Sequence, residues 1–196
     1  MDISSLLGTM MSDEGVSGMS QTASVSDTET RSILTAALPI LMSGALNQSN
    51  NSNTATGFAN ALTQHSANNT SNLSSFFGNV DTDDGSKIVD HLFGQNSDAI
   101  VAQIAGNSGV KKSDVKKVLA SAAPLMMSLL GQEVHTQQQS NSSAGVSSIM
   151  NSLLGGGNNN AATTASTANL LAGLLGGGSS SNNSSSGLST LLSLLK

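Results

Sequence analysis

The feature that most constrains the fold is an internal duplication at an offset of 85 residues. Residues 26–46 (SDTETRSILTAALPILMSGAL) align with residues 111–131 (KKSDVKKVLASAAPLMMSLLG), so that Pro39 falls on Pro124. Upstream of these segments the same offset places Asp13 on Asp98, and the apolar positions keep their phase. A single offset that holds over so long a stretch indicates two copies of one structural unit.

The duplication divides the chain into four parts. We expect a first helical repeat at 1–48, a linker with short helices at 49–85, a second helical repeat at 86–135, and a Ser/Asn/Gly-rich tail at 136–196. Glycines and polar caps divide each repeat into three helices. The predicted fold is therefore all-α, with two duplicated three-helix units packed about a pseudo-two-fold axis and a low-complexity tail that carries short leucine-rich helices.

The last helix of each repeat has the clearest pattern. Its apolar residues recur as pairs four positions apart, which is typical of a helix and not of a strand. Ser26 and Glu29 have the spacing of a capping box. Charges are absent after Arg31 and, in the second copy, after Lys117 until the helix is expected to end, so we expect both helices to be buried nearly all round. Their internal prolines predict a kink or break, near residues 38 and 123.

Composition excludes several classes of function. Charged residues make up 10% of the chain, against roughly 25% in typical domains. Seven basic against twelve acidic residues do not suit phosphate binding, so nucleic acid is not an expected partner. The absence of cysteine excludes disulfides and thiolate metal sites. The N-terminus lacks the pattern of a secretory signal, and the most apolar stretch, residues 32–46, is too short to span a membrane. We expect a cytoplasmic protein without a cofactor or a membrane span.

The tail contains three leucine patches between glycine-rich and serine-rich linkers. Leu153-Leu154 followed by three glycines recurs 21 residues later as Leu174-Leu175 followed by three glycines. Helices this short are marginal in water, so the patches must dock on the core, on each other, on a second copy or on a partner groove. The candidate interaction residues are Leu153, Leu154, Leu170, Leu171, Leu174, Leu175, Leu191, Leu192, Leu194 and Leu195.

Three histidines, His65, His91 and His135, are the main candidates for chemistry. His65 and His91 could meet in space and form part of a metal or acid–base site. The alternative is a partly buried structural histidine. Either way, we expect no catalytic residue and no metal ligand.

Three other motifs are weak. Residues 79–85 (NVDTDDG) resemble a calcium loop, but the glycine is one place late and Asp90 stands where a Glu is required. We expect Asp83 or Asp84 to cap a helix that begins near Ser86. Gly85-Ser86-Lys87 lacks the rest of a phosphate loop. The basic cluster at residues 111–117 suits a solvated face better than an anionic ligand.

The segments LTAALPILMSGAL, GFANALTQH, DGSKIVDHLFG, NSGVKKSDVKKVLASAAPLMMSLLGQ and SSIMNSLLGGG resemble the bacterial YidB-like family, also called domain of unknown function 937. The resemblance covers residues 1 to about 156 in order. It implies an all-helical fold and no established activity, and it transfers no site residue. The chain departs from the family in a glycine-rich segment, EGVSGMSQ, which we expect to weaken the second helix, and in its longer tail.

These patterns predict a non-enzymatic structural or interaction protein. It would self-associate, as a homo-oligomer, or bind another protein through its short leucine-rich helices. The alternative is a carrier of a small apolar ligand in a cavity between the repeats. A third hypothesis is an enzyme that uses His91 with Asp90 or Asp84.

Overall fold

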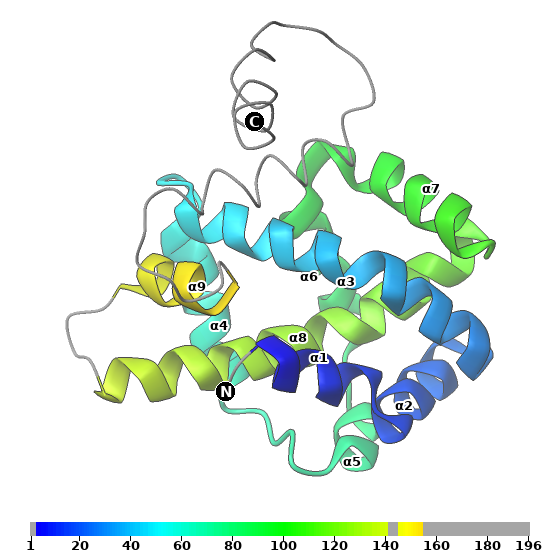
Figure 1. Cartoon of the computed structure of the whole chain (residues 1–196), viewed down its shortest axis with the longest axis horizontal. Coiled ribbons are helices and arrows are strands. Elements are labelled where there is room, and N and C mark those ends of the chain that lie inside the picture. Colours follow the sequence, from blue (N-terminus) through cyan, green and yellow to red (C-terminus); the bar gives the residue numbers. More distant parts are fainter. Residues whose placement is uncertain (1–2, 141–144, 155–196) are drawn as a thin grey trace, which may run out of the picture. The chain divides into compact units, whose positions relative to one another are not determined.

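The elements are all helical in the part of the chain that the computed structural model describes, residues 3–140 and 145–154 (Figure 1). This confirms the predicted all-α class. The described residues lie in the first of two compact units, which spans residues 1–157. The first repeat contains α1 (Ile3–Met11), α2 (Asp13–Ala23) and α3 (Asp27–Asn50), followed by α4 (Ala55–Ser66) and α5 (Leu73–Gly78). Then come α6 (Thr82–Phe93), the 3₁₀ turn η1 (Gly94–Asn96), α7 (Ser97–Ser108), α8 (Lys112–Ser140) and α9 (Val146–Leu154).

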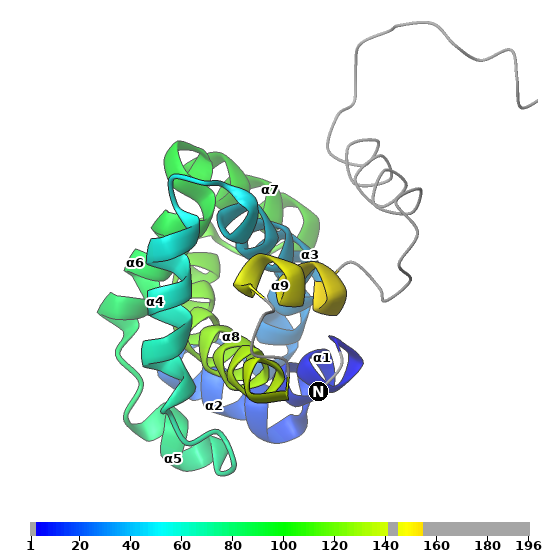
Figure 2. The ribbon, with the colours of Figure 1, turned by 90° about the vertical axis from the view of Figure 1, so that its left-hand side faces the viewer.

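Helix α8 is the centre of the core. Every residue from 118 to 131 is buried. Figure 2 shows α8 with the other helices around it, and it packs against α4 and α6 along most of its length. Leu119, Leu125 and Met126 are fully buried in this core, and so are the serines at 121 and 128. A helix that is apolar on all sides needs neighbours on all sides, which confirms the prediction for the second long helix.

Helix α3 does not meet the same expectation. Ile33, Leu34 and Leu41 are buried, but Thr35 and Pro39 are exposed. The prediction that α3 is buried nearly all round is therefore wrong. Helix α3 contacts α1, α2, α4, α6, α7, α8 and α9. Its exposed residues show that these neighbours do not cover it on every side.

Neither proline breaks its helix. Both α3 and α8 run through their prolines as continuous helices. A proline has no amide hydrogen, so each one leaves the carbonyl four residues earlier without its helical donor. In α3 that carbonyl belongs to exposed Thr35, where water can bind it. In α8 it belongs to buried Ala120, and the backbone of Gly85 on α6 lies against it.

The order of the helices agrees with the predicted duplication. Helices α2 and α7 begin 84 residues apart, and α3 and α8 begin 85 residues apart. Asp13 pairs with Arg31, and their counterparts Asp98 and Lys116 also pair, at 2.7 Å. The short helices α1 and α2 pack on α8 as well as on α3, and α6 and α7 pack on α3 as well as on α8.

Several helix ends differ from the predicted ones. The Ser26–Glu29 capping box is present. Helix α6, however, begins at residue 82, inside the predicted linker at 49–85, and α8 continues to residue 140, beyond the predicted end of the second repeat. The cap of α6 is Asp81, not Asp83 or Asp84, because Asp81 Oδ1 accepts the amides of both.

The glycine-rich segment forms the predicted second helix despite its glycines. Residues 13–23 make up α2. A β-carbon at Gly18 would lie 2.1 Å from the ring of Phe77, so the glycine makes the room in which α5 packs against α2. Tertiary packing thus stabilises a helix whose intrinsic propensity is low.

Candidate functional site

Helix α9, which ends in the first leucine patch, is docked on the helical core. Ile149 and Met150 of α9 are 3% and 0% exposed, and α9 packs against α3 and α8. Ser147 Oγ donates to the carbonyl oxygen of Ser49 at 2.5 Å, and Asn151 Nδ2 donates to Asn50 Oδ1 at 3.1 Å. The backbone of residues 153 and 154 belongs to α9. Their side chains, and every other leucine predicted as an interaction residue, lie outside the described residues.

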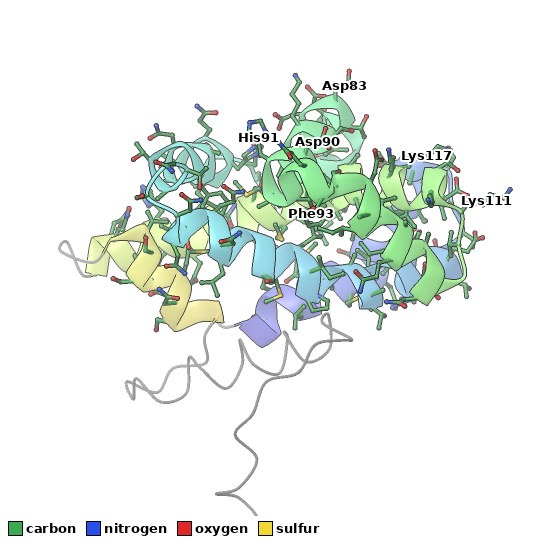
Figure 3. All side chains as sticks on the ribbon, turned by 90° about the horizontal axis from the view of Figure 1, so that it is seen from above. Asp83, Asp90, His91, Phe93, Lys111 and Lys117 are labelled. Carbon is green, nitrogen blue, oxygen red and sulfur yellow. The ribbon has the colours of Figure 1, made fainter. Side chains whose placement is uncertain are left out.

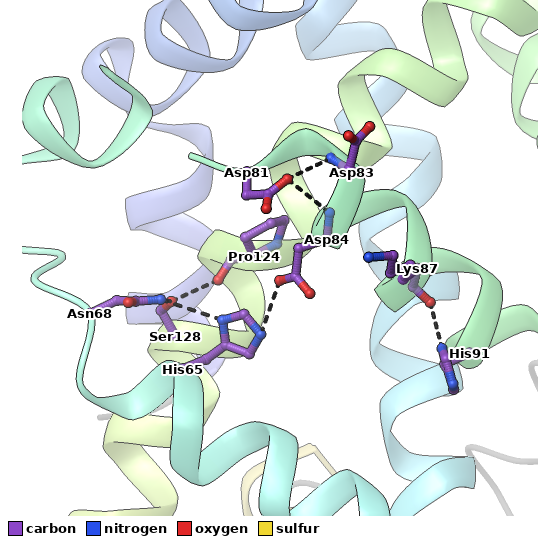
Figure 4. A network of polar contacts seen from close by, with 9 residues as sticks. All are labelled: His65, Asn68, Asp81, Asp83, Asp84, Lys87, His91, Pro124 and Ser128. Atoms are coloured by element: carbon purple, nitrogen blue, oxygen red, sulfur yellow. Dashed lines mark hydrogen bonds and ion pairs between the residues drawn. The ribbon is translucent and has the colours of Figure 1, made fainter. Parts of the chain in front are cut away.

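The three histidines occupy separate places. His91 lies on the exposed side of α6 next to Asp90 (Figure 3), where its Nδ1 donates to the carbonyl of Lys87 at 2.7 Å. Asp90 instead accepts from Ser97 Oγ at 3.0 Å. The sequence left open whether His65 and His91 meet in space, and the structure places His65 apart from His91 (Figure 4). The described residues include no cluster of three His, Asp or Glu side chains that could hold a metal ion.

His65 lies in a cleft of about 440 Å³ between α4, α5, α6 and α8. Its Nε2 is 3.4 Å from Asp84 Oδ2, and the two side chains are 16% and 43% exposed. Apolar surface is contributed by Phe76, Val80 and Pro124. The cleft therefore combines a carboxylate, an imidazole and an apolar wall.

A chain of hydrogen bonds defines the tautomer of His65 (Figure 4). Ser128 Oγ donates to the carbonyl of Pro124 at 2.7 Å and accepts from Asn68 Nδ2 at 3.0 Å. Asn68 Nδ2 also faces His65 Nδ1 at 3.4 Å. Because an amide nitrogen only donates, Nδ1 must be the acceptor, and the imidazole proton is on Nε2, toward Asp84.

Two glycines place the helices that form the cleft. A β-carbon at Gly131 of α8 would lie 2.2 Å from the carbonyl oxygen of Leu62, so α4 approaches α8 backbone to backbone there. A β-carbon at Gly85 would lie 1.7 Å from the carbonyl oxygen of Ala120. These two contacts bring His65 on α4 and the first turn of α6 to the same stretch of α8.

The remaining sequence motifs have structural roles. In the segment that resembles a calcium loop, Asn79 Nδ2 donates to the Ser75 carbonyl at 2.8 Å, and Asp81 caps α6. Lys111 and Lys117 lie at the far end of the molecule from α9 (Figure 3). Lys117 is 3.6 Å from Asp114 of its own helix.

The ion pair between α7 and α8 is exposed. The ammonium group of Lys116, which donates to Asp98, lowers the pKa of that carboxyl below its ordinary value. Asp98 in turn raises the pKa of Lys116. Both shifts follow from a charge-assisted hydrogen bond at the surface.

Sequence comparison places the chain in a family. A family model described as bacterial protein of unknown function (DUF937) matches residues 5–133. The chain belongs to the DUF937 family. The DUF937 region includes the cleft around His65, and α9 lies beyond its end. No curated protein and no solved structure matches the chain. Among the described helices of this DUF937 protein, none is long and apolar enough to cross a membrane.

Sequence reasoning missed the pairing of His65 with Asp84. It considered His65 with His91, and Asp84 with His91 or as a cap. The two paired residues are on different helices, and no periodic spacing connects them. Their contact depends on how α4 and α6 pack on α8, which only the tertiary structure shows.

Proposed function

We propose that this DUF937 protein is a non-enzymatic interaction protein that self-associates through short leucine-rich helices. The observation that carries the proposal is the docking of α9. This helix has nine residues, too few to be stable alone in water. Its two buried side chains and its hydrogen bonds to the end of α3 hold it in place. The helical unit therefore has a surface that accepts a short helix through the apolar side chains of Ile149 and Met150.

The sequence beyond α9 offers further helices of the same kind. The large apolar residues of α9, Ile149 and Met150, are followed by leucines three to five positions later, and the segment 170–175 repeats that spacing. Glycine, serine and asparagine dominate the residues between the patches, and chains of that composition are flexible tethers. Several weak helices on such tethers favour multivalent association, because each bound helix raises the effective concentration of the next.

Light scattering after size-exclusion chromatography of the full chain tests the proposal. The native chain should give a mass above 19.6 kDa that rises with concentration. Serine at positions 170, 171, 174 and 175 should reduce that mass to the monomer. Detection by refractive index is required, because the chain has no Trp and no Tyr.

A matched control changes the linkers and leaves the patches intact. Serine in place of Asn158, Asn159, Asn160 and Asn182 makes the same number of substitutions without removing an apolar side chain, and it should keep the native mass. A native chain that is monomeric at every concentration contradicts self-association. Equal loss of mass in the control would show that the leucines are not responsible.

A further inference from the structure

The cleft around His65 has the composition of a binding site for an organic cation. Asp81 and Asp84 contribute two carboxylates, and no Lys or Arg is among the described residues that line it. His65 carries at most one positive charge against these two carboxylates. The lining is therefore net negative, even though the amides at the start of α6 partly neutralise Asp81.

The apolar part of the cleft suits the stem of such a ligand. Phe76, Val80 and Pro124 lie on its walls, and an aromatic ring such as Phe76 attracts a cation at its face. The volume of about 440 Å³ falls within the range of small-molecule sites, roughly 300–1,000 Å³. Side-chain amides of Gln64 and Asn69 supply polar groups to the lining.

We propose that this cleft binds an ammonium or guanidinium group carried on an apolar stem, with Asp84 as its counter-ion and His65 as an internal competitor. Asp84 lines the cleft and is 43% exposed, so its contact with His65 does not enclose the carboxylate. The 3.4 Å separation is longer than a charge-assisted hydrogen bond of about 2.7–2.9 Å, so the pair leaves Asp84 able to accept a stronger donor.

Calorimetric titration of the full chain tests the proposal. The probes are Nα-acetyl-L-lysine methyl ester and its uncharged counterpart, Nα-acetyl-L-norleucine methyl ester. At about pH 8, where imidazoles are neutral, the lysine probe should bind at one saturable site, and the norleucine probe should bind at least tenfold more weakly. Asp84→Asn should weaken lysine binding at least tenfold. Asp83→Asn is the matched control, because Asp83 is an exposed neighbour outside the cleft lining, and it should leave binding unchanged.

The role of His65 has its own readout. Because His65 Nε2 lies 3.4 Å from Asp84 Oδ2, His65→Ala should bind the lysine probe more tightly than the native chain does. Thermal melting checks that each variant is folded. Absence of saturable binding to the native chain overturns the proposal, as does equal loss in Asp83→Asn and Asp84→Asn. An affinity that His65→Ala leaves unchanged overturns the competition by His65.

Discussion

Replacing Gly85 with alanine should destabilise the protein, although alanine favours helices. Gly85 lies inside α6, where it contacts the carbonyl oxygen of Ala120 that Pro124 leaves without a donor. An added β-carbon would lie 1.7 Å from that oxygen, half of the 3.4 Å at which ordinary contact begins. The obstructing atom belongs to the backbone of a buried helix, so α6 must move away from α8 and loosen the packing of Val89 and Leu92.

The size of the effect follows from two opposing contributions. Overpacking a core costs about 1–3 kcal/mol, and a clash with backbone belongs at the upper end of that range. Alanine gains about 1 kcal/mol over glycine inside a helix. The net expectation is a loss of about 2 kcal/mol in the free energy of unfolding.

Gly106→Ala is the matched control. Gly106 lies in α7, and a β-carbon there would meet nothing within 4 Å, so only the gain in helix propensity of about 0.5–1 kcal/mol applies. Urea unfolding followed by far-ultraviolet circular dichroism measures the free energy of unfolding of both variants, and thermal melts give their melting temperatures. The two variants should differ by about 2.5–3 kcal/mol. For a protein of this size 1 kcal/mol corresponds to roughly 2–4 °C, so the two melting temperatures should differ by about 5–12 °C.

A Gly85→Ala variant as stable as the native chain would refute this reasoning. It would mean that α6 does not approach the carbonyl of Ala120 as closely as the structure shows. The placement of Asp84 beside His65 would then lose its support as well, since the same contact positions both.

Three further predictions concern other parts of the described chain. Thr30→Val should raise the free energy of unfolding, measured in urea, by about 1 kcal/mol, because Thr30 Oγ1 is buried without a hydrogen-bond partner. Val115, at the matching place in the second repeat, is buried as well. A loss of stability in Thr30→Val would show that the hydroxyl has a partner. Lys116→Ala should return the pKa of Asp98 upward to its ordinary range in an NMR titration. The lowered pKa of Asp98 stabilises the folded state at pH values above the pKa that this carboxyl has in the unfolded chain. That contribution is lost as the pH falls through the lowered pKa. An Asp98 pKa that the substitution leaves unchanged would contradict the pairing. Met150→Ala should lower the free energy of unfolding by about 2–4 kcal/mol, because Met150 is fully buried. Amide hydrogen exchange in α9 should become faster, while the amides of α8 keep their protection. An equal loss of protection in α8 would show that the two helices unfold together.

The helical class and the main helices could be predicted because they depend on local pattern. The pairs of apolar residues four apart identify the stretches that became α3 and α8, and the Ser26–Glu29 spacing identifies the start of α3. The offset of 85 residues anticipated that Asp13 and Asp98 would occupy matching positions, and both make an ion pair with the following long helix.

Local pattern could not show what surrounds each helix. The two proline helices look alike in sequence, but α8 is enclosed on all sides and α3 is not, because the number of neighbours depends on how all the helices pack. Gly18 reads as a helix-weakening residue, yet it is required where the ring of Phe77 packs against α2. The low helix propensity of glycine is outweighed here by burial, and burial depends on tertiary packing.

The sequence by itself determined that the chain is helical, duplicated in pattern, poor in charge, and that its last part alternates leucine patches with segments rich in Gly, Ser and Asn. Only the tertiary structure decided that α9 docks on α3 and α8, and that His65 meets Asp84 and not His91. Helix formation depends on neighbours within about four residues. The contacts of α9 with Ser49 and Asn50 and the His65–Asp84 pair join residues on different helices, so they depend on packing that no local spacing encodes.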